Sequence, residues 1–255
     1  MSRDKVLGKI TETIKEDFYH EKDSYPDAFC GICEVAVDIA FRNTKCILIG
    51  DEKTGPRRDK GTFGVEAGYE MKSYSDFGKP EYDDVHRKMC EICISELRKE
   101  DLPSDYGVAQ MIVNMATRYM YAHWFCEDDA HRLEMKDNYH FILDSYTLRW
   151  LNCCGLEGKP KCLNRNTIWG RLNYDRYIEI QRYADMCVKT IFPDYSRIEA
   201  EILIEEEVKL YDAMKTINVF EKIDPENYLL SYARNYFGEA DKVKLHGFME
   251  AINNG

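Results

Sequence analysis

The chain has 255 residues, of which 44% are hydrophobic and 32% charged, and its formal net charge is −11. This composition is typical of a globular domain and excludes a disordered, fibrous or disulfide-stabilised secreted chain. Because no apolar run reaches the roughly 18 residues of a membrane span and the N-terminus lacks the apolar region of a secretory signal, we expect a cytoplasmic protein without membrane contact.

The spacing of apolar residues predicts helices along most of the chain. In the first third it predicts a charged amphipathic helix over 1–19 and an apolar-rich helix over 27–42, and it leaves 46–49 open between a short strand and a helix end. Residues 50–80 hold six of the 15 glycines and two of the seven prolines, which predicts an irregular Gly-rich insertion. Any strand is expected within about 45–75.

Helical patterns resume after residue 80. The predicted helices cover 81–99, 106–124, 144–151, 174–190, 196–216, 224–238 and 239–252. Asp144 or Ser145 is a suitable N-cap for the third of them. Since no linker and no internal repeat divides the chain, we predict an all-α fold with one composite helical domain over 1–255.

The ten cysteines are expected to be mostly free thiols in a reducing cytoplasm. Two pairs have C-x-x-C spacing, Cys30 with Cys33 and Cys90 with Cys93. Four such thiolates could hold zinc, but both pairs fall in helical patterns, where a spacing of three residues also suits packing in a core. We favour buried thiols and predict neither a metal nor a cofactor.

An uncharged polar stripe runs along the helix predicted over 106–124. Gln110, Asn114, Thr117 and Tyr121 are spaced to lie on one face, opposite an apolar face. Amides and hydroxyls in place of Lys and Glu indicate a half-buried face that makes directed hydrogen bonds. The stripe could form the wall of a ligand site or a hydrogen-bonded seam between helices, and the tendency of buried polar groups to be paired favours the seam.

Asp144 follows an apolar run that begins after His140 and precedes a helix. An aspartate in this position most often caps the helix. The positive helix end favours its ionised form, so the same carboxylate could also act as a general base or stabilise a developing cation.

The segment Ile142-Leu-Asp-Ser-Tyr-Thr-Leu-Arg-Trp-Leu resembles the signature around the catalytic aspartate of helix-hairpin-helix DNA glycosylases. Upstream, Leu102-Pro…Gly107-Val-Ala-Gln is similar to their hairpin. The order of these motifs is also similar to small bacterial proteins. The resemblance covers about 97–156 and implies a glycosylase-like helical core there. It implies a catalytic role for Asp144 and a ligand pocket, whose candidate residues are Gln110, Asn114, Arg118, Tyr121 and His140.

The chain departs from that family at several points. The hairpin has one glycine, Gly107, in place of two, and Gln110 or Met111 stands where bifunctional members have a lysine. An acidic insertion over 127–136 and the net charge of −11 are unfavourable for binding duplex DNA. We therefore favour a non-catalytic or diverged binding protein with a protein or small-molecule partner. The alternative is a monofunctional base-excision glycosylase that acts on DNA through Asp144.

Overall fold

The computed structural model describes residues 7–8, 11–12, 14–16, 32–49, 82–99, 101–126, 139–205 and 208. The main helices of these residues are α2 (Ile32–Ile49), α4 (Tyr82–Lys99), α5 (Tyr106–Cys126), α7 (Ser145–Cys153) and α8 (Tyr174–Ile191), with a short 3₁₀ helix, η1 (Trp169–Arg171), before α8. Residues 197–205 are also helical, and the described residues contain no strand. The fold is all-α, as predicted.

The predicted helix positions agree closely with the structure between residues 82 and 205. Before that range, α2 extends past the predicted helix end at residue 42 and continues through 46–49 to Ile49. The stretch that the sequence left open between strand and helix end is therefore helical. The Gly-rich insertion over 50–80 and the helices expected over 224–238 and 239–252 lie outside the described residues. The same is true of the acidic insertion over 127–136.

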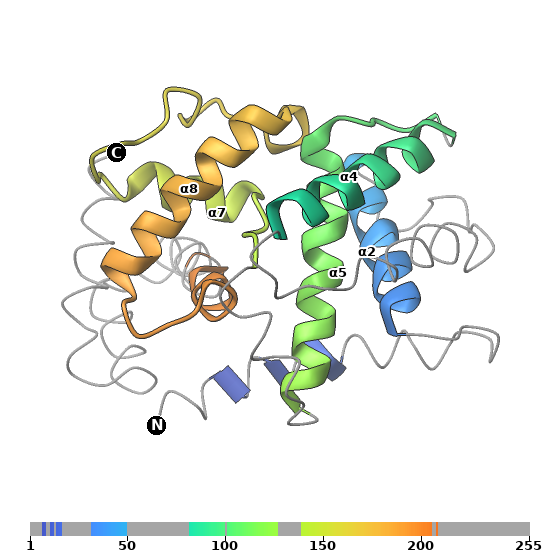
Figure 1. Ribbon diagram of the computed structural model, residues 1–255, viewed down its shortest axis with the longest axis horizontal. Coiled ribbons are helices and arrows are strands. Elements are labelled where there is room, and N and C mark those ends of the chain that lie inside the picture. Colours follow the sequence, from blue (N-terminus) through green and yellow to red (C-terminus); the bar gives the residue numbers. More distant parts are fainter. Residues whose placement is uncertain are drawn as a thin grey trace, which may run out of the picture.

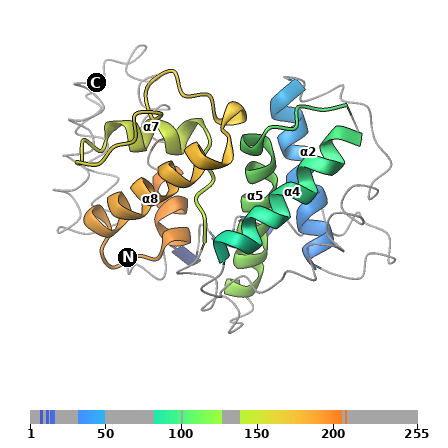
Figure 2. The same cartoon turned by 45° about the horizontal axis from the view of Figure 1, so that its top comes forward.

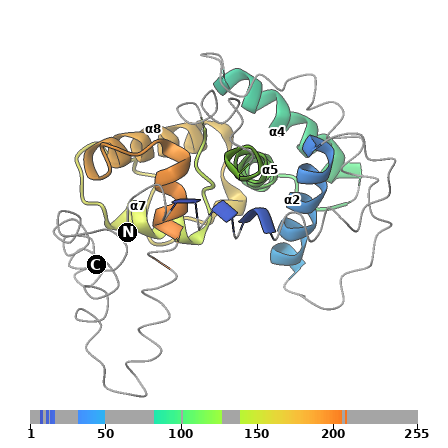
Figure 3. The same cartoon turned by 90° about the horizontal axis from the view of Figure 1, so that it is seen from below.

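Helix α5 occupies the centre of the molecule. It packs against α2, α4, η1 and α8, and the view along its axis shows it between the other helices (Figures 1 and 3). Most of its residues between Tyr106 and Ala122 are buried. Its sequence has few charged side chains to oppose this burial, because Arg118 is its sole Lys, Arg, Asp or Glu residue. A helix that is uncharged around its circumference is typical of a core position.

The remaining helices form two groups on either side of α5. Helices α2 and α4 lie on one side, whereas α7, α8 and the helix over 197–205 lie on the other (Figure 2). Helices α7 and α8 of the second group each begin at an N-cap. The Asp144 carboxylate accepts the amide of Thr147 at 2.8 Å, and the Asn173 side chain accepts the amide of Arg176 at 3.0 Å. Asp144 is the cap that the sequence predicts.

At Gly107 the backbone of α5 lies against the backbone of η1. The Gly107 amide donates to the Leu172 carbonyl at 2.9 Å. A Cβ atom at position 107 would lie 1.8 Å from the Trp169 carbonyl oxygen. This approach requires glycine, because rigid backbone on the facing element cannot move aside for a methyl group.

None of the helices in the described part of the chain is both long enough and apolar enough to span a membrane.

We predict that Gly107→Ala destabilises the protein by about 2 kcal/mol or more, because the added methyl group forces α5 and η1 apart. Gly170→Ala is the matched control, since its Cβ would meet the Val108 side chain at an ordinary 3.9 Å. Urea unfolding of both variants measures the difference. Equal stability of the two would show that the backbones separate at little cost.

Candidate functional site

Gln110 and Asn114 hydrogen-bond one buried segment, 139–143, which has no regular secondary structure and contains His140. Gln110, Asn114, Arg118 and Tyr121 lie on α5, and His140 lies within the segment. Asp144 follows directly and caps α7. The Leu143 amide donates to the Gln110 side-chain carbonyl at 3.3 Å, which brings the Asp144 segment next to the polar stripe of α5.

Side chains from two helices hydrogen-bond the backbone at Phe141. On α8, Gln181 accepts the Phe141 amide at 3.0 Å and donates to the Phe141 carbonyl at 2.7 Å. On α5, Asn114 donates to the same carbonyl at 3.0 Å. Among the described residues no strand lies beside this buried segment, so it needs such partners, because an unpaired backbone group is costly in the interior.

The flanking residues of the segment are held in the same way. Glu201 accepts the Ile142 amide at 2.7 Å, and Arg197 donates to the Tyr139 carbonyl at 3.4 Å. Arg197 is itself paired with Asp185 on α8 at 2.8 Å. The segment thus connects α5 and α8 to the helix over 197–205.

The polar stripe of α5 is part of this hydrogen-bonded seam. Besides its contact with Leu143, the Gln110 side chain accepts from Asn114 at 3.0 Å and donates to the Gly107 carbonyl at 2.9 Å. Further along, the Thr117 hydroxyl donates to the Val113 carbonyl at 2.8 Å. Gln110, Asn114 and Thr117 are all buried. The bonds of Gln110 and Asn114 to the segment and to α8 have the form of the seam that the sequence favours, whereas the Thr117 bond stays within α5.

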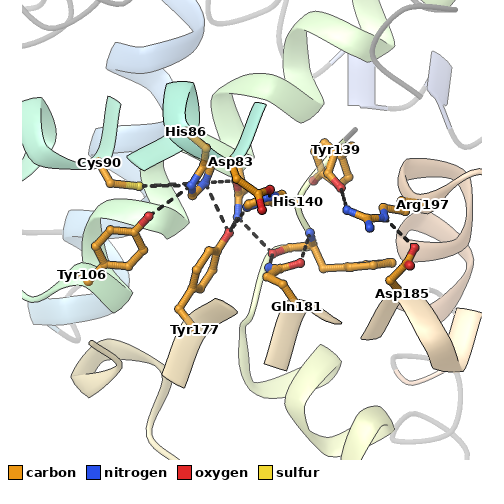
Figure 4. A network of polar contacts seen from close by, with 12 residues as sticks. Asp83, His86, Cys90, Tyr106, Tyr139, His140, Tyr177, Gln181, Asp185 and Arg197 are labelled. Atoms are coloured by element: carbon orange, nitrogen blue, oxygen red, sulfur yellow. Dashed lines mark hydrogen bonds and ion pairs between the residues drawn. The ribbon is translucent and has the colours of Figure 1, made fainter. Parts of the chain in front are cut away.

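A chain of hydrogen bonds runs from the surface into the core through two histidines (Figure 4). Asp83 on α4, with its side chain 62% exposed, lies 2.8 Å from His140 Nε2. His140 Nδ1 lies 3.0 Å from the Tyr177 hydroxyl, and that oxygen lies 3.3 Å from His86 Nε2. The rings of His86 and Tyr177 stack at 5.3 Å between centroids.

The partners of each ring nitrogen indicate the protonation state of the histidines. His140 Nε2 faces a carboxylate and carries the proton, so Nδ1 accepts from Tyr177. His86 Nε2 faces the Asn114 carbonyl oxygen at 2.8 Å and also carries the proton, so Nδ1 accepts from Tyr106 at 3.3 Å. This assignment gives each imidazole a single proton, in agreement with the lowered pKa of both histidines.

Burial explains the titration of this network. Desolvation lowers the pKa of His140 and holds that of His86 well below its ordinary value. Desolvation also keeps the pKa of Tyr177 well above its ordinary value. The hydrogen bond from His140 lowers the pKa of Asp83. The network therefore holds one charge, the carboxylate at its solvent end.

The cysteines of α4 belong to the core. Cys90 and Cys93 are buried free thiols, as predicted, whereas Cys33 is half-buried and Cys30 lies outside the described residues. Burial raises the pKa of Cys93 and holds that of Cys90 well above the ordinary range. Cys90 Sγ lies 3.7 Å from His86 Nδ1. In the described part of the chain, no three His, Cys, Asp or Glu side chains form a group that could hold a metal ion.

A second polar cluster joins α5 to the helix over 197–205. Arg118 pairs with Glu201 at 3.3 Å and also with Glu205. Burial raises the pKa of Glu201 to about 7. Burial likewise raises the pKa of Asp144, whose side chain caps α7. Tyr121, the remaining member of the predicted set, is buried on α5.

The structure also has an open hollow of about 880 Å³ that the sequence analysis missed. Its lining comes from the loop before η1, from η1 itself and from the first turns of α8, and it includes none of the predicted site residues. The sequence feature that could have indicated it is the excess of Lys and Arg over Asp and Glu in 159–182, within an acidic chain.

Comparisons with known proteins add no relative. No protein-family model matches this chain, and no curated protein and no solved structure matches it.

The buried network is arranged to hold helices together. The polar atoms of Gln110, Asn114 and Gln181 are bonded to the chain itself. The ring nitrogens of His86 and His140 are likewise bonded to other side chains. To contact these groups, a ligand would have to replace internal hydrogen bonds.

We predict that Gln181→Met destabilises the protein by about 2 kcal/mol, because methionine has a similar length but leaves the Phe141 amide unpaired in the core. Arg182→Met, at the next and exposed position of α8, is expected to change the unfolding free energy by less than about 0.5 kcal/mol. Urea unfolding of both variants provides the measurement. A loss that is no greater for Gln181→Met would contradict the role assigned to this amide.

We also predict that His86 makes stability decrease in acid. Its folded-state pKa lies below its unfolded-state value, so the unfolded chain binds the proton first as the pH falls. The contribution is complete above about pH 6.5 and is lost at lower pH, by about 1.4 kcal/mol between about pH 7.5 and about pH 5.5. His86→Gln removes this contribution but retains His140 and Glu201, so the wild type should lose more stability than the variant over this interval. Parallel curves of unfolding free energy against pH would refute it.

Proposed function

We propose that this chain is a non-catalytic binding protein of the cytoplasm, and that its partner is a protein or a small molecule. The resemblance of 97–156 to helix-hairpin-helix glycosylases remains an expectation about its ancestry. On this interpretation the polar residues of that region act in folding, and recognition takes place on the surface.

The observation that carries this proposal is the internal use of the polar side chains that a glycosylase pocket would need. Gln110, Asn114 and His140 are buried and bonded to backbone or side chains of this protein. A base flipped out of DNA needs open polar groups around it, because recognition depends on hydrogen bonds to the base edge. The saturated network therefore supports a structural role.

Asp144 and Gly107 support the same conclusion. One oxygen of Asp144 accepts the Thr147 amide, and the residue is half-buried. The Gly107 amide donates to the Leu172 carbonyl, and the Trp169 carbonyl fills the space beside the glycine. In a DNA-binding hairpin the glycine amide would face a phosphate. In this structure the Gly107 amide faces protein.

Charge favours a partner other than nucleic acid. With a formal net charge of −11, the chain repels a DNA backbone at long range. The free thiols found at seven described cysteines are consistent with the reducing cytoplasm proposed for it.

We predict that Asp144→Asn changes stability by less than about 0.5 kcal/mol, because asparagine caps a helix about as well as aspartate, and that Asp144→Ala costs about 1 kcal/mol. Thermal unfolding of the two variants tests the capping role.

An excision assay tests the functional part of the proposal. Wild-type protein is incubated with duplex DNA that contains uracil or alkylated bases, and free base is measured with Asp144→Asn as the matched variant. We expect no release from either protein. Release by the wild type that disappears in Asp144→Asn, while the variant remains folded, would establish the glycosylase alternative and overturn the binding proposal.

A further inference from the structure

The hollow beside α8 is basic in a strongly acidic protein. Residues 159–182 contain six Lys or Arg side chains and two carboxylates, whereas the whole chain has 35 basic and 46 acidic residues. Three of the six cations, Lys161, Arg171 and Arg176, line the hollow together with Asp175 and Glu179. The local charge is therefore opposite in sign to that of the chain, and an anion would be drawn to this site.

The three cations are available to a ligand. Within the described part of the chain, none of Lys161, Arg171 and Arg176 forms an ion pair, although two carboxylates share the lining. One of these, Glu179, accepts from the Cys162 thiol at 3.6 Å. The fold thus places the three cations in the lining of one hollow, where no described residue forms an ion pair with them.

The loop that carries much of the lining is ordered by its own polar side chains. The Thr167 hydroxyl donates to the Cys162 carbonyl at 2.7 Å and accepts the Asn164 amide at 2.8 Å. The Asn164 side chain in turn accepts the Asn166 amide at 2.9 Å. These contacts form the loop without a helix or strand, and a preformed loop reduces the entropy lost on binding. The segment returns from α7 to the start of α8 on the outer side of the molecule (Figure 1).

We infer that this hollow binds a small molecule through a phosphate group. The inference rests on the proposed binding function and names the ligand class. Two arginines and a lysine match the charge of a phosphate, and a guanidinium can donate two parallel hydrogen bonds to its oxygens. The volume of about 880 Å³ lies in the range of small-molecule sites. The remainder of such a ligand can be hydrogen-bonded by the side-chain amide groups of three lining residues, Asn164, Asn166 and Asn173.

Titration with inorganic phosphate, followed by NMR of ¹⁵N-labelled full-length protein, tests this inference. We expect saturable shifts centred on 161–176 with a dissociation constant of about 1 mM or below. Arg171→Gln/Arg176→Gln should weaken binding roughly tenfold or more, because two charged hydrogen-bond donors are lost. Lys161→Gln is a second, independent variant that should also weaken it.

The matched control is Arg98→Gln/Arg182→Gln, which removes the same charge from exposed positions outside the lining. It should bind phosphate as the wild type does. Shifts that fail to saturate, equal shifts with sodium chloride at the same ionic strength, or equal weakening in the two double variants would each overturn the inference. Such a result would leave the excision assay unaffected, so failure of this site is distinguishable from failure of the proposed function.

Discussion

The buried segment 139–143 is the constraint on which the rest of the described structure depends. It crosses the core with no strand beside it among the described residues, so its backbone groups must find side-chain partners. Gln181 and Asn114 supply them at Phe141, and Glu201 supplies one at Ile142. An unpaired group would cost about 1–3 kcal/mol. The positions at which α5, α8 and the helix over 197–205 meet are therefore set by hydrogen bonds as well as by apolar packing.

The histidine network extends this arrangement to α4. Asn114 donates to the Phe141 carbonyl and also accepts from His86, so the same side chain serves the segment and the second histidine. His140 lies within the segment and reaches Asp83 at the surface. Because the network shares its members, loss of one residue disturbs several contacts. Such interdependence explains how so many polar groups can be buried in one core.

The functional interpretation depends on the contrast between the hydrogen-bonded network of the core and the basic hollow at the surface. Polar groups that already have internal partners contribute to stability, whereas Lys161, Arg171 and Arg176 line an open hollow and form no ion pair within the described part of the chain. The glycosylase-like motif and the hollow are distinct parts of the chain. The first determines how the helices pack, and we assign recognition to the second.

The sequence by itself determined the helices, because their apolar periodicity and caps are local properties. The uncharged stripe of α5 and the cap at Asp144 could be predicted for the same reason. The partners of that stripe could not be predicted, because they lie far away in the sequence, as Asn114 and Tyr177 do at 63 residues apart. The same holds for the rest of the network, in which His86 and Tyr177 are 91 residues apart. The hollow depends on an irregular loop with no periodic pattern. Only the tertiary structure decided these features, because they arise where distant segments or non-periodic backbone come together.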